Sequence, residues 1–164
     1  MPLDVAGSCR CGSVRFICQS HTPVPYQRCY CSVCRKTAGG GGFAINIGAD
    51  SRSLNLDGED SIGVYRAELK DGNGQCKLST AERKFCTACG SALWLFSPEW
   101  PELIHPFASV VDSELPKAIS RVHMMLSFAA SWARPEISHG DDSFDLYPDL
   151  SLEDWHRRHN VWAP

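Results

Sequence analysis

Three thiols lie within six residues of one another in the stretch Cys29-Tyr30-Cys31-Ser32-Val33-Cys34. A structural zinc ion normally has four protein ligands, whereas a catalytic zinc keeps one position open for water or substrate. No fourth thiol follows nearby, because the next residues are Arg35-Lys36-Thr37-Ala38 and the four glycines Gly39 to Gly42. We therefore interpret this stretch as a three-thiolate metal site with an open coordination position. The rest of the chain must position this site and bring a substrate to it.

Four other cysteines form a Cys-x-Cys pair and a Cys-x-x-Cys pair that are far apart in the sequence, namely Cys9 and Cys11, and Cys86 and Cys89. Four thiolates are the number that closes a tetrahedral structural site. Such a site would tie the first hairpin to the strand that begins at Ser91. On ligand chemistry alone the opposite partition is also open, for example with Cys18 or Cys76 closing the three-cysteine stretch.

The remaining candidates have structural interpretations. Cys18 and Cys76 are expected to be buried, inert thiols, because free cysteine packs as a small apolar residue. His123 is expected to be structural rather than a ligand, since soft thiolates already satisfy the metal's preference. With these interpretations the two cysteine groups keep all of their seven thiols as metal ligands.

Disulfide and redox chemistry fit the cysteine pattern less well than metal binding. Disulfides persist mainly in oxidising compartments, and a Cys-x-Cys bridge is strained. The chain has nine cysteines, an odd number, and its first residues lack the basic end and apolar stretch of a signal peptide. A redox Cys-x-x-Cys would open a helix in a βαβ context, which we do not find at Cys86. We therefore expect reduced thiols in a cytoplasmic protein.

Composition indicates an ordinary globular domain. The chain has 164 residues, of which 43% are hydrophobic and 21% are charged, enough for one domain with a real core. A net charge of −3 disfavours nucleic-acid binding, because phosphate contacts need a basic face. No apolar run approaches membrane-spanning length. We expect neither a nucleic-acid nor a membrane partner, and the pattern leaves homo-oligomerisation open.

Short alternating segments separated by turn residues predict a mainly β fold. A hairpin is expected over residues 3–18 with Gly12 at its turn, which would place Cys9 and Cys11 on one face of an extended chain. Asp71-Gly72-Asn73-Gly74 is a strong signal for a second hairpin turn. Further strands are expected over residues 43–47, 64–69, 75–80, 91–96, 102–111 and 118–128.

Two helical segments are predicted from their capping residues. Ser32 is placed to cap one turn that brings Cys31 and Cys34 together. Near the end of the chain, Ser151 is followed by an acidic residue three positions later, which indicates a short helix. Trp155 on that helix is expected to pack against the domain.

Three motifs together resemble the glutathione-dependent formaldehyde-activating enzyme family, whose domain is shared by centromere protein V. They are Gly7–Phe16, Cys29–Thr37 and Phe85–Ser91. The resemblance implies a β-tent fold of short antiparallel strands stapled by a four-cysteine zinc. It places a zinc-binding, formaldehyde-activating-like domain at residues 1–135 and a tail with a short packed helix at 136–164. Tyr30 departs from the family pattern, which commonly has His there, and the four glycines are also unusual.

The resemblance also implies two zinc ions and a reaction. A structural zinc would be held by Cys9, Cys11, Cys86 and Cys89, and a catalytic zinc by Cys29, Cys31 and Cys34. The implied activity is that of a carbon–sulfur lyase, which joins glutathione or a similar thiol to formaldehyde or another small aldehyde. The alternative is a non-catalytic zinc-binding module for protein interaction, with the three-cysteine site closed by a fourth ligand.

A metal bound to three thiolates would leave a negative charge that nearby cations could balance. One zinc ion and three thiolates carry a net charge of −1. Arg28, Arg35 and Lys36 flank the thiols and could also hold the carboxylates of glutathione. Gly40 and Gly41 could offer backbone donors to it. The alternatives are that the cations form a solvated basic rim and that the glycines form a mobile linker.

Overall fold

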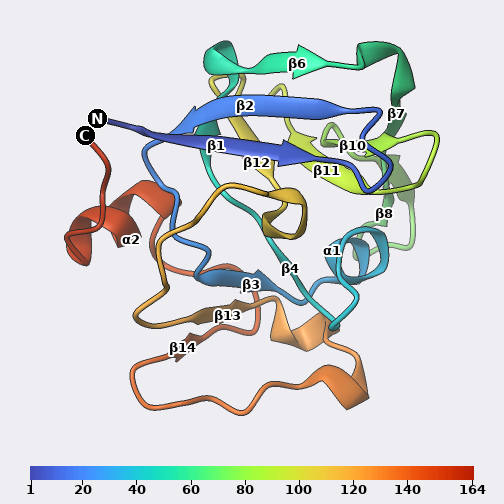
Figure 1. Cartoon of the computed structure of the whole chain (residues 1–164). Helices are drawn as coiled ribbons and strands as arrows, with labels where there is room; N and C mark the ends of the chain where they lie inside the picture. Colours follow the sequence, from blue (N-terminus) through green and yellow to red (C-terminus); the bar gives the residue numbers. More distant parts are fainter.

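Most of the chain is built into short β-strands. The computed structural model describes residues 1–164, with fourteen strands and two α-helices, α1 (Ser32–Thr37) and α2 (Leu152–Arg158). The prediction of a mainly β protein with a short C-terminal helix is confirmed. The two chain termini lie close together (Figure 1). Neither helix is long and apolar enough to cross a lipid bilayer.

Two antiparallel sheets enclose the main core. The first sheet has the order β1-β2-β6, with β1 Leu3–Ser8, β2 Arg15–Ser20 and β6 Asn55–Asp57. The second has the order β5-β12-β11-β10-β7, with β5 Ala49–Asp50, β12 Leu103–Pro106, β11 Ala92–Phe96, β10 Glu82–Cys86 and β7 Ile62–Tyr65. In Figure 1 β1 and β2 lie over β11 and β12. Phe16 and Trp94 meet edge to face at 5.5 Å between ring centroids in this core.

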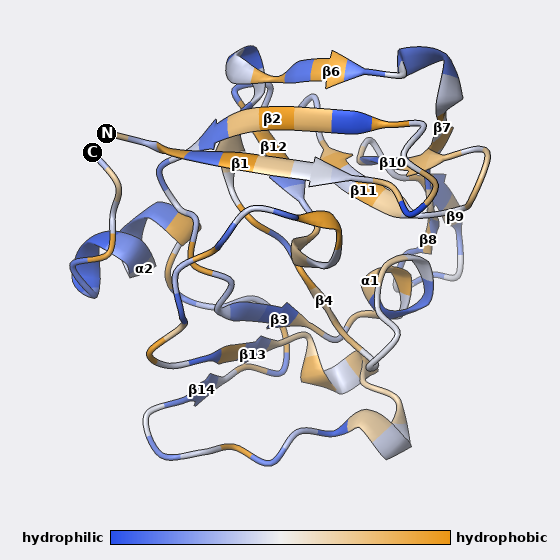
Figure 2. Ribbon diagram, in the orientation of Figure 1, coloured by the Kyte–Doolittle hydropathy of each residue, from blue (hydrophilic) through white to orange (hydrophobic).

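Burial along the strands follows the sequence pattern. On β2 the side chains of Phe16, Cys18 and Ser20 are buried and those between them are exposed, as expected for a strand with one covered face. On β11 adjacent residues Leu93 and Trp94 are both buried, because this strand lies in the middle of its sheet and is covered on both faces. Figure 2 shows the hydrophobic residues of both strands.

A third sheet brings the C-terminal part of the chain beside the three-cysteine stretch. Its order is β14-β13-β3-β4, with β14 Asp142–Ser143, β13 Val122–Met124, β3 Gln27–Cys29 and β4 Ala44–Ile45. β13 is parallel to both β3 and β14, so the expected antiparallel arrangement does not extend to these two pairings. The parallel pairing is possible because β13 follows β3 by a long excursion through the second sheet.

Several predicted strands are shorter than the sequence suggested. The segment 64–69 is split between β7 and β8 (Glu68–Lys70), and the return strand β9 covers only Cys76–Leu78. The turn between β8 and β9 has the predicted form, with Gly74 at a φ of 78°. The segments 102–111 and 118–128 contain only β12 and β13 as strands. Pro106 ends β12, as expected of a residue that cannot donate to a ladder.

The C-terminal helix packs on the domain through two buried residues, Trp155 and His156. Ser151 caps α2 by accepting a hydrogen bond from the Asp154 amide, as predicted. Trp155 is buried and stacks on Tyr26 with 3.6 Å between ring centroids. A small cluster with Val24 and Val122 completes this second core. The division of the chain at residue 135 stays a prediction.

Candidate metal centre

Four cysteine sulfurs from two turns lie within 4.8 Å of one another, those of Cys9, Cys11, Cys86 and Cys89. The Sγ–Sγ distances are 3.5 Å between Cys9 and Cys11 and 3.8 Å between Cys11 and Cys86. A tetrahedral zinc with bonds of about 2.3 Å places its sulfurs about 3.8 Å apart. All nine cysteines are free thiols, so the disulfide alternative is wrong for this structure. The donor set therefore fits a closed metal site.

Local backbone structure presents these four thiols to one another. Cys9 follows β1 directly, and its Sγ accepts a hydrogen bond from the Val14 amide. The expectation that Cys9 and Cys11 lie on an extended strand is wrong, because β1 ends at Ser8 and both residues lie in the turn. The Arg10 amide donates to Ser91 Oγ, which joins this turn to the one between β10 and β11. The two hairpins are thus tied where the ligand count predicted.

A second group consists of the three clustered thiols of Cys29, Cys31 and Cys34, whose sulfurs also lie within 4.8 Å of one another. We call these residues the three-cysteine cluster. Cys29 ends β3, and Cys31 is the N-cap of α1, with its Sγ accepting a hydrogen bond from the Cys34 amide. The predicted cap, Ser32, is instead the first helical residue and is exposed. The Cys31 thiol takes the capping position because it must also face its two partner thiols.

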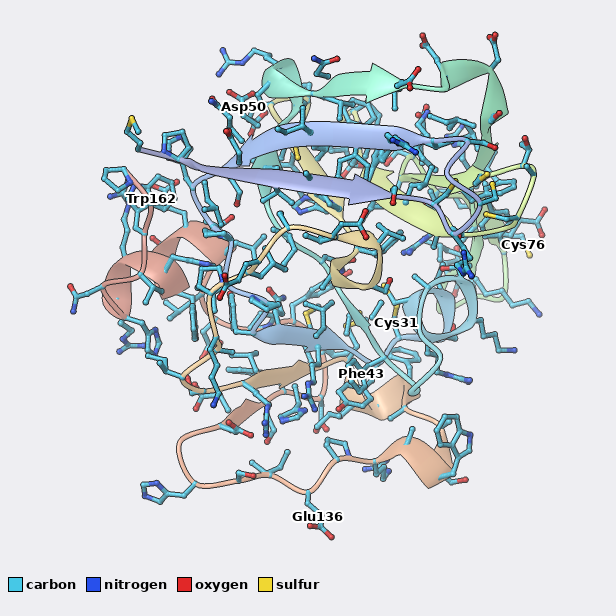
Figure 3. The ribbon with its side chains drawn as sticks, viewed as in Figure 1. Cys31, Phe43, Asp50, Cys76, Glu136 and Trp162 are labelled. Carbon is cyan, nitrogen blue, oxygen red and sulfur yellow. The ribbon has the colours of Figure 1, made fainter.

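Neither leftover cysteine joins either group. Cys18 is buried, with its thiol 3.8 Å from the Val5 carbonyl oxygen, as expected of an inert thiol. Cys76 is exposed, so the prediction that it is buried is wrong. It lies on the two-stranded β8–β9 hairpin, which has no core of its own to cover it. Figure 3 shows Cys76 at the periphery and Cys31, which is half-buried, near α1. The alternative in which Cys18 or Cys76 closes the three-cysteine cluster does not occur.

Hydrogen bonding within the three-cysteine cluster favours one thiolate even before any metal is considered. Hydrogen bonds from Cys29 and Cys34 lower the pKa of the Cys31 thiol to about 2. The same hydrogen bond to Cys31, together with burial, raises the pKa of Cys29. For Cys34 a hydrogen bond with Cys29 lowers the pKa, but its bond to Cys31 and burial outweigh that and raise it overall. Three sulfurs that hydrogen-bond to one another in this way form a donor set that suits a soft metal ion.

Arg83 is a cation at the three-cysteine cluster that the sequence analysis did not identify. Its Nη2 lies 3.6 Å from Cys34 Sγ, and its Nη1 lies 3.5 Å from Thr37 Oγ1. Arg83 belongs to β10, the strand that ends at Cys86. Cys86 is part of the four-cysteine group, which consists of Cys9, Cys11, Cys86 and Cys89. Its positive charge lowers the pKa of Cys31, after the effects of the neighbouring thiols and burial. A basic residue three positions before Cys86 was the only sequence signal for it.

Of the five residues predicted to bind substrate, three line one cavity and two do not. Arg35, Lys36 and Gly40 line a cavity of about 460 Å³ beside α1, with Ser91 and Ser109 among the other lining residues. Arg28 and Gly41 do not line it. The Arg28 guanidinium lies instead over the Phe43 ring, 4.6 Å from its centroid. A Cβ built on Gly41 would be 3.6 Å from the same ring.

Two residues that line this cavity, Arg35 and Gly39, have constrained surroundings. Arg35 Nε is buried and has no hydrogen-bond partner, which is costly for a charged donor. A Cβ on Gly39 would meet the Phe43 carbonyl oxygen at 2.2 Å, so the close turn after α1 requires glycine there. A second cavity of about 290 Å³ is lined by Arg83, and Thr37 and Ala92 border both cavities. The two spaces therefore adjoin along the end of α1.

Tyr30, between two of the clustered cysteines, is held by a buried histidine. Its hydroxyl lies 3.0 Å from His123 Nδ1, and the ring of Phe43 lies 5.3 Å away between centroids. His123 is fully buried and is in neither cysteine group, in agreement with its expected structural role. Its other ring nitrogen lies 3.4 Å from Asp141 Oδ2.

Comparison with known proteins gives the following similarities. The family model described as glutathione-dependent formaldehyde-activating enzyme matches residues 4–126. A protein of Halomonas elongata, provisionally named a glutathione-dependent formaldehyde-activating enzyme, is 51% identical over 152 residues, which is 93% of this chain and 94% of that protein. A crystal structure of a Rhodobacter sphaeroides protein aligns with 24% identity and a TM-score of 0.47, over 69% of this chain and 99% of that one.

Proposed function

Since this chain belongs to the glutathione-dependent formaldehyde-activating enzyme family, we propose that it is a carbon–sulfur lyase that joins glutathione, or a similar thiol, to formaldehyde or another small aldehyde. In this reaction the thiol sulfur forms a bond to the carbonyl carbon, and the proton of the thiol ends on the carbonyl oxygen. The observation that supports the proposal best is the three-cysteine cluster, which gathers three sulfurs without a fourth protein ligand. None of the three cysteines lines either cavity, but Arg35 and Lys36, which directly follow Cys34, line the larger one.

Zinc is the metal that we propose for both cysteine groups. Cys9, Cys11, Cys86 and Cys89 would hold a structural ion, and Cys29, Cys31 and Cys34 would hold the catalytic one. A zinc with an open position supplies acidity, favouring the thiolate form of an incoming thiol and polarising a carbonyl. The free thiols that this chemistry needs agree with the cytoplasmic location that we propose.

Cations of this chain would hold the anionic parts of the substrate. A tripeptide thiol has two carboxylates, and Arg35 and Lys36 both line the larger cavity. The Arg35 guanidinium would pair with a carboxylate there, since arginine can make two parallel hydrogen bonds to one. Ser91 and Ser109 add hydroxyl donors. At about 460 Å³ the cavity is within the range of small-molecule sites.

Arg83 would balance the charge of the loaded cluster. Three thiolates and one zinc ion have a net charge of −1, which opposes the approach of a further thiolate. The Arg83 guanidinium is in contact with Cys34 Sγ and also borders the smaller cavity, so it faces both the cluster and the space beside it. We propose that it lowers this repulsion and orients the incoming thiol.

Exchange NMR of glutathione and formaldehyde with the zinc-loaded protein tests this function. The adduct also forms spontaneously, so only a rate above the protein-free rate counts. We expect the wild-type protein to accelerate exchange and the Cys31→Ser variant to lose this acceleration. A zinc-loaded wild-type protein with two ions bound and no rate enhancement would refute the lyase proposal.

The alternative, a non-catalytic zinc module, predicts a different response to the thiol. A closed metal site keeps its coordination when glutathione is added, whereas an open one gains a sulfur ligand. Cobalt-substituted protein reports this change through its absorption spectrum. An unchanged spectrum at saturating glutathione would favour the interaction module.

A further inference from the structure

A buried chain of polar side chains runs from the three-cysteine cluster to the C-terminal part of the protein. It consists of the Tyr30 hydroxyl, the His123 imidazole and the Asp141 carboxylate, with distances of 3.0 Å and 3.4 Å. Tyr30 is 2% exposed, His123 is 1% exposed and the Asp141 side chain is 5% exposed. Buried polar groups at this depth destabilise the fold unless each has a hydrogen-bond partner. The three side chains therefore stabilise one another as a hydrogen-bonded series.

The donor and acceptor roles in this chain follow from its charged end. Asp141 accepts a hydrogen bond from the Arg121 amide through Oδ1, and Arg121 Nη1 lies 3.8 Å from Oδ2. A carboxylate only accepts, so His123 Nε2 must carry the hydrogen that points to Asp141. Burial keeps the imidazole neutral, which leaves Nδ1 as an acceptor. The Tyr30 hydroxyl is therefore the donor to His123.

Backbone hydrogen bonds also hold the segment that contains Cys29 and Tyr30. The Tyr30 amide donates to the Met124 carbonyl at 3.0 Å, and β3 pairs with β13 so that Cys29 faces Met124. β13 pairs in turn with β14, which begins one residue after Asp141. Asp141 therefore lies beyond residue 126, where the family match ends, yet it is linked through His123 to Tyr30, which lies between two cysteines of the cluster.

We propose that Asp141 is a positioning residue for the three-cysteine cluster, acting through His123 and the Tyr30 hydroxyl to hold the segment that joins Cys29 to Cys31. Both neighbours of Tyr30 in the sequence are thiols of the cluster, so a rotation of this residue moves two of the three sulfurs at once. The inference rests on the proposed function only in taking the cluster as a zinc site. It makes the tail a part of that site.

The test is a chelator competition for zinc, with the four-cysteine group as an internal reference. Partners that orient metal ligands typically contribute about 10-fold or more in metal affinity. We expect Tyr30→Phe and Asp141→Asn each to lower the affinity of the three-cysteine cluster about 10-fold while the other ion stays bound. The controls are Tyr26→Phe, which removes another buried tyrosine hydroxyl, and Asp142→Asn, which changes an exposed carboxylate one residue away. Both should bind two ions as the wild type does.

A spectroscopic measurement separates positioning from general stability. Long-range ¹H–¹⁵N spectra of the imidazole should show His123 protonated at Nε2 in the wild type, and this pattern should be lost in Asp141→Asn. Equal affinity in Tyr30→Phe, Asp141→Asn and wild type would overturn the proposal. A parallel loss of both ions with a lower unfolding temperature would also overturn it, since it would show a merely structural role. Absence of lyase activity in a wild type that binds two ions would refute only the proposed function.

Discussion

Replacing Arg83 with glutamine removes the one guanidinium that contacts a sulfur of the three-cysteine cluster. In the structure Arg83 Nη2 lies 3.6 Å from Cys34 Sγ, and Arg83 is half-buried while Cys34 is buried. Cys34 has a raised pKa, mainly because its hydrogen bond with Cys31 and its burial outweigh the favourable hydrogen bond with Cys29. In the proposed zinc-bound cluster the Cys34 sulfur would be a thiolate, and the guanidinium would then have an anionic acceptor.

The size of the effect follows from distance and screening. Coulomb's law for unit charges 3.6 Å apart gives about 5 kcal/mol at an effective dielectric constant of about 20 and about 1 kcal/mol in water. Part of this attraction is already present without metal, because the Cys31 thiol has a low pKa. The lower part of the range is therefore appropriate, near the value of about 1.5 kcal/mol for a hydrogen bond to a charged group. This corresponds to about a 10-fold loss of zinc affinity.

Competition with a chromophoric chelator measures this loss at the three-cysteine cluster. Arg83→Lys keeps the positive charge but cannot contact Thr37 and Cys34 with two separate nitrogens. We therefore expect a smaller loss of zinc affinity than in Arg83→Gln. Lys70→Gln makes the same change in net charge on the exposed β8–β9 hairpin and should leave both ions in place. If Arg83→Gln binds its second zinc within twofold of the wild type, the charge-balancing role of Arg83 is wrong.

Three further predictions concern the metal content, the pH dependence of stability and the backbone at two glycines. Cys31→Ser should lower the zinc content from two ions to one without unfolding the protein, as metal analysis with circular dichroism will show; two retained ions would contradict the assignment. Burial lowers the pKa of His156, whose Nε2 accepts from the Val24 amide, so the unfolded state binds more protons below pH 6.5 and stability falls on acidification. Wild type should lose up to about 1.4 kcal/mol per pH unit more than His156→Gln between pH 6.5 and 5.5 in denaturant titrations. Gly74→Ala, at a φ of 78° in open space, should cost about 1 kcal/mol, whereas Gly58→Ala should cost clearly more because its Cβ would meet a backbone carbonyl oxygen; equal costs in thermal unfolding would refute this.

The features that the sequence predicted well depend on neighbouring residues. The turn at residues 71–74, the Ser151 cap and the hairpin of β1 and β2 all follow from local backbone preferences. The grouping of cysteines was also predictable, because ligand number is a strong constraint on a metal site. These are cases in which the physical cause lies within a few residues or in simple stoichiometry.

The features that the sequence predicted poorly depend on tertiary contacts. Arg83 reaches the three-cysteine cluster only because β10 crosses the end of α1, and no spacing within the sequence reveals that crossing. Asp141 is similar, since its place beside His123 comes from the parallel pairing of β13 with β14. Cys76 was assigned to the interior from the average behaviour of free cysteine, which fails on a hairpin that projects from the domain.

The two cysteine groups are connected by a single strand. β10 carries Cys86 of the four-cysteine group at its end and Arg83 three residues earlier, a distance of about 10 Å along an extended chain. If the four-cysteine group holds an ion, fixing Cys86 would also restrain the guanidinium that contacts Cys34. On the opposite side, β13 and Asp141 hold Tyr30 through His123. The three-cysteine cluster thus has a cation supplied by one sheet and its backbone held by another. This would let the proposed open zinc site keep its geometry with only three protein ligands.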